Sequence, residues 1–117
     1  MTEEQYCMKY RNQFAPQPRL HGQSPWGQID HLEMIAPGIM FASTPSHGGY
    51  WLSKARWDRL APLLKDLGTF GDNPLNWFEE DCDSRIVALA YPSELGVPDD
   101  LGPELKRQLF PTTTVTN

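Results

Sequence analysis

A chain of 117 residues has the size of one domain, and a composition of 39% apolar and 11% aromatic residues is sufficient for a packed core. The net charge of -5 opposes a nonspecific grip on nucleic acid, so we do not expect nucleic acid as a partner. The sequence has neither a membrane-length apolar stretch nor a signal-peptide pattern, and its two cysteines stand apart, outside any metal-binding or C-x-x-C spacing. We therefore expect a cytoplasmic protein with reduced thiols and no membrane contact.

Residues 1–28 are rich in glutamine and proline and show no sustained helical or strand period, which predicts an irregular N-terminal arm. Four aromatic residues lie in this segment, too many for a solvated tail: Tyr6, Tyr10, Phe14 and Trp26. We expect the arm to lie along the domain or along a partner.

The next segment has the pattern of a three-stranded antiparallel meander. Residues 29–35 alternate, with Leu32 and Met34 on one face, and a turn sequence at residues 36–38 separates them from a second strand at residues 39–44. A tight loop at residues 45–49 leads to a third short strand at residues 50–52.

Helical signals follow the strands. Ser53 is placed as the N-cap of a helix that runs toward Gly68 and is kinked or divided at Pro62. A second, central helix is predicted from Pro74 to Tyr91, with the inward stripe Phe78, Cys82, Ile86 and Leu89.

The apolar run at residues 86–91 is also compatible with a buried strand, because a short run does not decide between the two periods. Pro103 opens a further short helix, and residues 111–117 form a loose tail. The chain is therefore predicted to be an α+β protein: one domain over residues 29–110, in which about three antiparallel strands pack against two to four helices.

Two polar motifs are the candidate functional sites. The first is the loop at residues 44–49, where Ser46 and His47 stand beside Gly48 and Gly49. Adjacent glycines permit positive φ and a close approach of another group, which is typical of a ligand-facing loop. An ordinary turn between strands requires the same residue types, so this alternative stays open.

The second motif is the acidic segment Glu79, Glu80, Asp81, Cys82 and Asp83. On a helix Glu79 and Asp83 share a face, and their repulsion requires water, a basic partner or a cation. The alternative is compensation of the helix dipole by solvated carboxylates. Together the two motifs predict a hypothetical metal site formed by His47, Glu79, Glu80 and Asp83.

Two other chemistries receive weaker support. Ser46 or Cys82 could act as a nucleophile activated by His47, but carboxylates around Cys82 would raise its thiol pKa, the wrong direction for a nucleophile. Trp77 could stack on a ligand, although tryptophans at such positions are more often found in a core or an interface. No complete catalytic set and no cofactor motif stands in the sequence, so we expect neither an enzyme nor a cofactor.

The strings TPSHGGYWLS and WFEEDCDSRIVALAYP resemble a group of small phage, prophage and mobile-element proteins that share a T-P-x-H-G-G-x-x-L-S loop and a W-[YF]-E-E-D-C-D segment. The resemblance covers roughly residues 38–92 and implies a short accessory protein in the bacterial cytosol. With the aromatic arm, it predicts a protein that binds a host protein, as an inhibitor of a bacterial defence component, and that forms a homodimer. The alternative function is a small metal-assisted hydrolase or ligand-binding domain that uses the two motifs.

Overall fold

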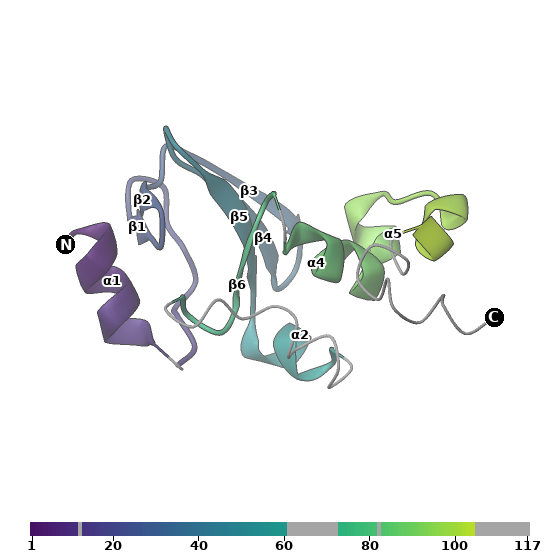
Figure 1. Ribbon diagram of the computed structural model, residues 1–117, viewed down its shortest axis with the longest axis horizontal. Helices are drawn as coiled ribbons and strands as arrows, with labels where there is room; N and C mark the ends of the chain where they lie inside the picture. Colours follow the sequence, from purple (N-terminus) through teal and green to yellow (C-terminus); the bar gives the residue numbers. More distant parts are fainter. Residues whose placement is uncertain (12, 61–72, 82, 105–117) are drawn as a thin grey trace, which may run out of the picture.

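The computed structural model describes residues 1–11, 13–60, 73–81 and 83–104, and it confirms the α+β class. A four-stranded antiparallel sheet in the order β3-β4-β5-β6 forms the middle layer. The N-terminal segment lies on one side of this sheet and the helices α4 and α5 lie on the other (Figure 1). Within the described part of the chain, no helix is long and apolar enough to cross a membrane.

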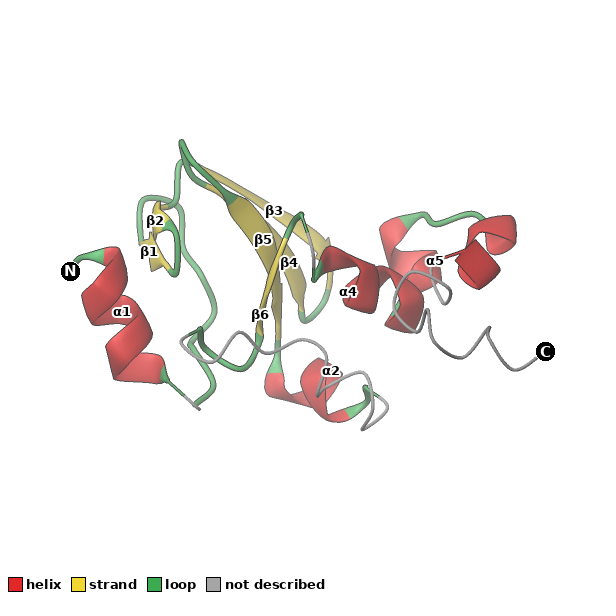
Figure 2. Ribbon diagram, viewed as in Figure 1, coloured by secondary structure: helices red, strands yellow, loops and turns green. Residues whose placement is uncertain are grey.

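The predicted three-stranded meander is confirmed and gains a fourth strand. β3 (His31–Ala36) pairs with β4 (Ile39–Ser43), which pairs with β5 (Gly48–Leu52), and β6 (Trp77–Glu79) lies along the free side of β5 (Figure 2). The turn between the first two strands is formed at Gly38, whose φ of +85° is the left-handed conformation that glycine adopts without strain.

The prediction of an irregular arm over residues 1–28 is wrong where the structure has regular elements. Residues Glu3–Tyr10 form helix α1, and β1 (Gln23–Ser24) pairs with β2 (Gly27–Gln28) in a small hairpin. Thr2 and Gln5 form a capping box at the start of α1. The helix has only one buried residue, Tyr6, so its sequence lacks the apolar stripe that would have predicted a helix. The segment lies along the domain, one of the two positions expected for it.

The prediction of an N-cap at Ser53 is confirmed. Its side chain accepts a hydrogen bond from the backbone N–H of Arg56 at the start of α2 (Lys54–Asp58). The continuation toward Gly68, with the break at Pro62, lies outside the described residues.

The prediction of one helix from Pro74 to Tyr91 is wrong in its first half. Trp77–Glu79 is the strand β6, and the helix α4 spans Ser84–Ala90. Both Trp77 and Phe78 are fully buried, one on each face of the sheet, which is the pattern of a strand covered on both faces and not of an amphipathic helix. Pairing with β5 outweighs the helical spacing that the sequence also contains.

The alternative strand at residues 86–91 is wrong as well, because Ile86 and Val87 are buried from within α4. Pro92 opens α5 (Pro92–Leu95), and a 3-10 turn, η1, spans Asp99–Leu101. The backbone is helical at Pro103 and Glu104, and the rest of the predicted last helix and the tail lie outside the described residues.

The core is divided in two by the sheet. We call the side covered by the N-terminal segment the front face; its buried residues are Tyr6, Ala15, Ile29, Met40, Ala42, Trp51 and Trp77. We call the side covered by α4 and α5 the back face; its buried residues are Ile39, Leu52, Leu60, Phe78, Ile86, Val87 and Tyr91.

Candidate functional site

The two polar motifs meet across β5 and β6. The two strands are antiparallel, and their register pairs Gly49 with Glu79, Tyr50 with Phe78, and Trp51 with Trp77. The pairing continues for one step beyond the strands, because the Glu80 N–H donates to the Gly48 carbonyl at 2.9 Å. One further step in the same register places His47 opposite Asp81.

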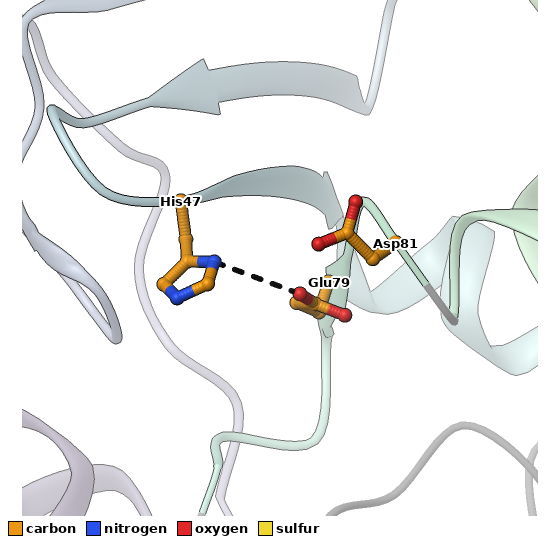
Figure 3. Close-up of side chains that lie close together, drawn as sticks. All are labelled: His47, Glu79 and Asp81. Carbon is orange, nitrogen blue, oxygen red and sulfur yellow. Dashed lines mark ion pairs between the residues drawn. The ribbon is translucent and has the colours of Figure 1, made fainter.

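The alternation of a strand places His47, Glu79 and Asp81 on the front-face side of the sheet, the side of Trp51 and Trp77. Nδ1 of His47 lies 3.8 Å from Oε2 of Glu79, and the three side chains each offer a ligand atom within 4.8 Å of the other two (Figure 3). The His47 side chain is 50% exposed and that of Glu79 is 16% exposed, so the cluster faces solvent at one end and the core at the other.

Thr44 holds the loop that carries His47. Its hydroxyl donates to the His47 carbonyl at 2.8 Å and accepts from the His47 N–H at 3.1 Å and the Ser46 N–H at 3.4 Å. The backbone N–H of Thr44 also donates to the His47 carbonyl at 2.8 Å. The imidazole is therefore attached to a tight turn with a fixed backbone.

The two glycines of the loop motif are needed for close approach and not for positive φ. Both lie in β5, and neither has the positive φ that the sequence suggested. A Cβ on Gly49 would stand 2.4 Å from the ring of Trp26 and 2.5 Å from the Phe78 carbonyl, and one on Gly48 would stand 2.9 Å from the Ala42 carbonyl. A bare backbone at these positions lets Trp26 and the neighbouring strands reach β5 beside the cluster.

The structure brings Asp81, not Glu80 or Asp83, to His47 and Glu79. Glu80 alternates to the other face of the sheet, near Tyr50, whose hydroxyl pKa is raised by burial and, to a smaller extent, by the charges of Glu33 and Glu80. The helix expected here would have placed Glu79 beside Asp83, whereas the strand places it beside Asp81.

Asp83 is the most unusual polar group of the described residues. It is the N-cap residue of α4 without a side-chain capping bond, it is only 4% exposed, and its Oδ2 has no hydrogen-bond partner among the residues that the structure describes. Burial, with a smaller contribution from the charge of Glu79, raises the pKa of the Asp83 carboxyl to about 7. An acidic group adjoining the cluster is thus poorly solvated and poorly paired.

Other predicted site residues have different environments. The Ser46 side chain is exposed in the turn and makes no hydrogen bond to His47 within the described part of the chain. Trp77 is fully buried and donates from Nε1 to the Tyr6 hydroxyl at 3.2 Å, so it is a core residue and offers no stacking surface. Cys82 lies outside the described residues.

A buried amide outside both sequence motifs fixes the start of β6. The Asn76 side chain accepts from the Ala15 N–H at 2.8 Å and donates to the carbonyls of Ala15 at 3.1 Å and Leu52 at 2.9 Å. It therefore joins β6, β5 and the N-terminal segment. Nothing in the local sequence separates Asn76 from an ordinary turn asparagine, since both partners are distant in the chain.

The donor set of the cluster is that of a divalent-cation site. One imidazole nitrogen with two carboxylates suits zinc, and manganese to a lesser degree. Metal-ligand bonds of about 2.0–2.2 Å put two ligand atoms of a tetrahedral site about 3.5 Å apart, so ligand atoms that lie up to 4.8 Å from one another need to close by about 1 Å to share one ion. Three protein ligands would leave a coordination position for water or another ligand.

A family model described as Domain of unknown function (DUF7007) matches residues 19–113. No curated protein and no solved structure matches the chain.

Proposed function

The chain belongs to the family described as Domain of unknown function (DUF7007), and from its geometry we propose that it binds a divalent cation, zinc above all, through His47, Glu79 and Asp81. The observation that carries the proposal is the convergence of these side chains, from a hairpin turn and from the end of a strand, to within 4.8 Å of one another. Their assembly depends on sheet register and not on proximity along the chain.

Asp83 is a second observation in favour of the proposal. One oxygen of this buried carboxylate has no partner within residues 1–11, 13–60, 73–81 and 83–104, and its charge interacts with that of Glu79, so the carboxylate costs the fold free energy. A cation held by Glu79 and Asp81 would offset the repulsion among these carboxylates.

The chemistry of such a site follows from its ligand count. A zinc ion with three protein ligands keeps water in its fourth position and lowers the pKa of that water, which is the arrangement of hydrolytic zinc sites. If the protein is an enzyme, the reaction that this site supports is metal-assisted hydrolysis. The exposure of His47 allows a ligand to reach the ion from solvent.

The test is calorimetric titration of the metal-free protein with zinc and with manganese. We expect one site in the wild type, and binding weakened by at least about tenfold in His47→Gln and Glu79→Gln, because each removes a direct ligand. Glu80→Gln and His31→Gln are matched controls, since Glu80 is the adjacent carboxylate on the opposite face and His31 is an exposed histidine of β3.

Equal zinc binding by the wild type and both ligand variants would overturn the proposal. Weakening in Glu80→Gln as large as in Glu79→Gln would do the same, because it would show a diffuse acidic surface in place of a site.

Protein binding is a second candidate function, supported by the surface of the N-terminal segment. Three large apolar side chains there are exposed: Met1 at 62%, Met8 at 66% and Leu20 at 51%. Exposed apolar groups gathered on one segment are typical of an interaction surface. The resemblance to phage and mobile-element proteins adds the proposal that the partner is a bacterial host protein, such as a defence component.

The two functions use different residues, so one pair of variants separates them. A docking function keeps its partner in His47→Gln, whereas a cation function loses zinc in that variant. Co-purification of a host partner with the wild type and with His47→Gln, but not with a Met8→Asp and Leu20→Asp double variant, is the result expected for docking.

A further inference from the structure

A groove of about 670 Å³ lies beside α1, on the N-terminal segment. Tyr6 and Tyr10 of α1 line it together with the stretch from Pro16 to Arg19, and none of the three proposed cation ligands contributes. Its volume falls within the range of about 300–1,000 Å³ that is usual for ligand pockets.

One wall of the groove is made of rings, of which Tyr10 and Pro16 are open to solvent whereas Tyr6 and Pro18 are buried. The rings of Tyr6 and Tyr10 lie 4.9 Å apart at 54°, and Tyr6 is held in place by the hydrogen bond from Trp77. Pro16 and Pro18 add two further rings to the lining, and their φ angles are fixed by the pyrrolidine. Grooves lined by aromatic side chains bind extended proline-rich segments, because such segments lose little conformational entropy on binding.

The charge of the groove differs from that of the whole chain. Arg19 is the one charged side chain among the lining residues that the structure describes, and it is exposed, whereas the chain as a whole carries a charge of -5. An arginine at an apolar groove pairs with a carboxylate through a charge-assisted and often bidentate hydrogen bond. Charge complementarity therefore favours an acidic partner here, although the rest of the protein would repel one.

We propose that this groove binds a proline-rich segment of a partner protein, with a carboxylate of that segment paired to Arg19. The inference rests on the second proposed function, protein binding, and names the chemistry of the partner. The prolines of the segment would pack against Tyr10 and Pro16, the two rings of the lining that are open to solvent, and a glutamate or aspartate at its end would reach the guanidinium.

The test is titration of the full chain with a fluorescent peptide of consecutive prolines that ends in a pair of glutamates, and with the same peptide ending in lysines. We expect the acidic peptide to bind at least about tenfold more tightly, a difference equal to one charge-assisted hydrogen bond. Arg19→Glu should reverse this preference. Arg59→Glu, which changes an exposed arginine at the end of α2, should leave it unchanged.

The inference is overturned if the two peptides bind alike, if neither binds, or if Arg19→Glu and Arg59→Glu behave identically. A host partner that still co-purifies with Arg19→Glu would preserve the protein-binding function and overturn only its assignment to this groove. A third proline peptide, ending in a pair of serines, isolates the ring contacts. Binding weaker than that of the acidic peptide and stronger than that of the basic peptide supports the inference, because it shows that both the rings and the charge contribute.

Discussion

The two faces of the sheet are joined to their covering layers by different interactions. On the front face, Asn76 and the indole N–H groups of Trp51 and Trp77 bond to the N-terminal segment, at Ala15 and at the Tyr6 hydroxyl. On the back face, aliphatic side chains of α4 pack against Leu52 and Phe78. Directional bonds fix a register, whereas apolar packing tolerates small shifts. The candidate cation site lies on the front-face side, and its carboxylates lie at the end of the strand whose start Asn76 fixes.

The largest expected effect comes from breaking the front-face hydrogen bonds. Asn76→Ala leaves the Ala15 N–H and the Leu52 carbonyl buried without partners, so we expect a loss of about 3 kcal/mol in the free energy of unfolding. Ile86→Val, which removes one methylene from the back face, should cost only about 1 kcal/mol. Urea denaturation measures both, and equal costs would contradict the difference between the faces.

The second prediction concerns the buried carboxylate of Asp83, whose effect on the free energy of unfolding should depend on pH. Its folded-state pKa of about 7 lies above the ordinary value of 3.8, so its charge costs nothing below pH 4 and costs most above pH 7. The shift corresponds to at most about 4 kcal/mol, and we expect about half of this after relaxation and solvation. In the metal-free protein, Asp83→Asn should therefore be more stable than the wild type at pH 8 by about 2 kcal/mol.

The measurement for Asp83 is the unfolding free energy of both proteins between pH 4 and pH 8, with a chelator present. The advantage of Asp83→Asn should vanish near pH 4, and saturating zinc should reduce it at pH 8 if the ion offsets the same charges. An advantage that does not change with pH would show that the Asp83 carboxyl is not strained in the fold. Ser84→Ala, at the neighbouring position, removes the hydrogen bond from the Ser84 hydroxyl to the Glu80 carbonyl at 2.6 Å but no titratable group, so its cost should not change between pH 4 and pH 8.

The predictability of this molecule from its sequence depends on whether a segment is shaped by its neighbours in the chain or by distant contacts. The strand predicted in residues 29–35, the turn at Gly38 and the N-cap at Ser53 are local signals, and the structure confirms them. The alternation predicted for that strand is only partly observed, because Met34 is 58% exposed and a bulge lies between Met34 and Ala36. The strand β6 is not local, since it is defined by pairing with β5. A strand of three residues is too short to show an alternating pattern, and the helical spacing of the nearby α4 hides it in the sequence.

The same distinction explains the candidate site. The sequence motifs identified His47 and the acidic segment, and the structure brings them together. The choice of carboxylates followed from the assumed helix, where Glu79 pairs with Asp83, and the observed strand pairs Glu79 with Asp81 instead. The bonds of Asn76 depend on contacts with segments far away in the sequence, which no local pattern encodes. Helix α1 has one local signal, the capping box of Thr2 and Gln5, but its packing through Tyr6 depends on distant Trp77.

The smallest effect is expected at Lys54 of α2, where two basic side chains of one helix provide a matched pair. Lys54 forms an exposed ion pair with Asp58 at 2.8 Å, and we expect Lys54→Ala to cost less than about 0.5 kcal/mol. Arg56 is better enclosed: it donates to the Pro37 carbonyl and to Glu94, and its guanidinium lies 4.9 Å from the Tyr91 ring.

Arg56→Ala should therefore cost about 1.5 kcal/mol, because it removes several contacts that join the β3–β4 turn to the back-face helices. Urea denaturation at low and high salt separates the two residues. The Lys54 effect should disappear at high salt because both partners are exposed, whereas most of the Arg56 effect should persist, since its side chain is only 16% exposed. Equal salt sensitivity would mean that Arg56 acts through charge alone, and the back face would then lack the packed polar contact that ties it to the turn.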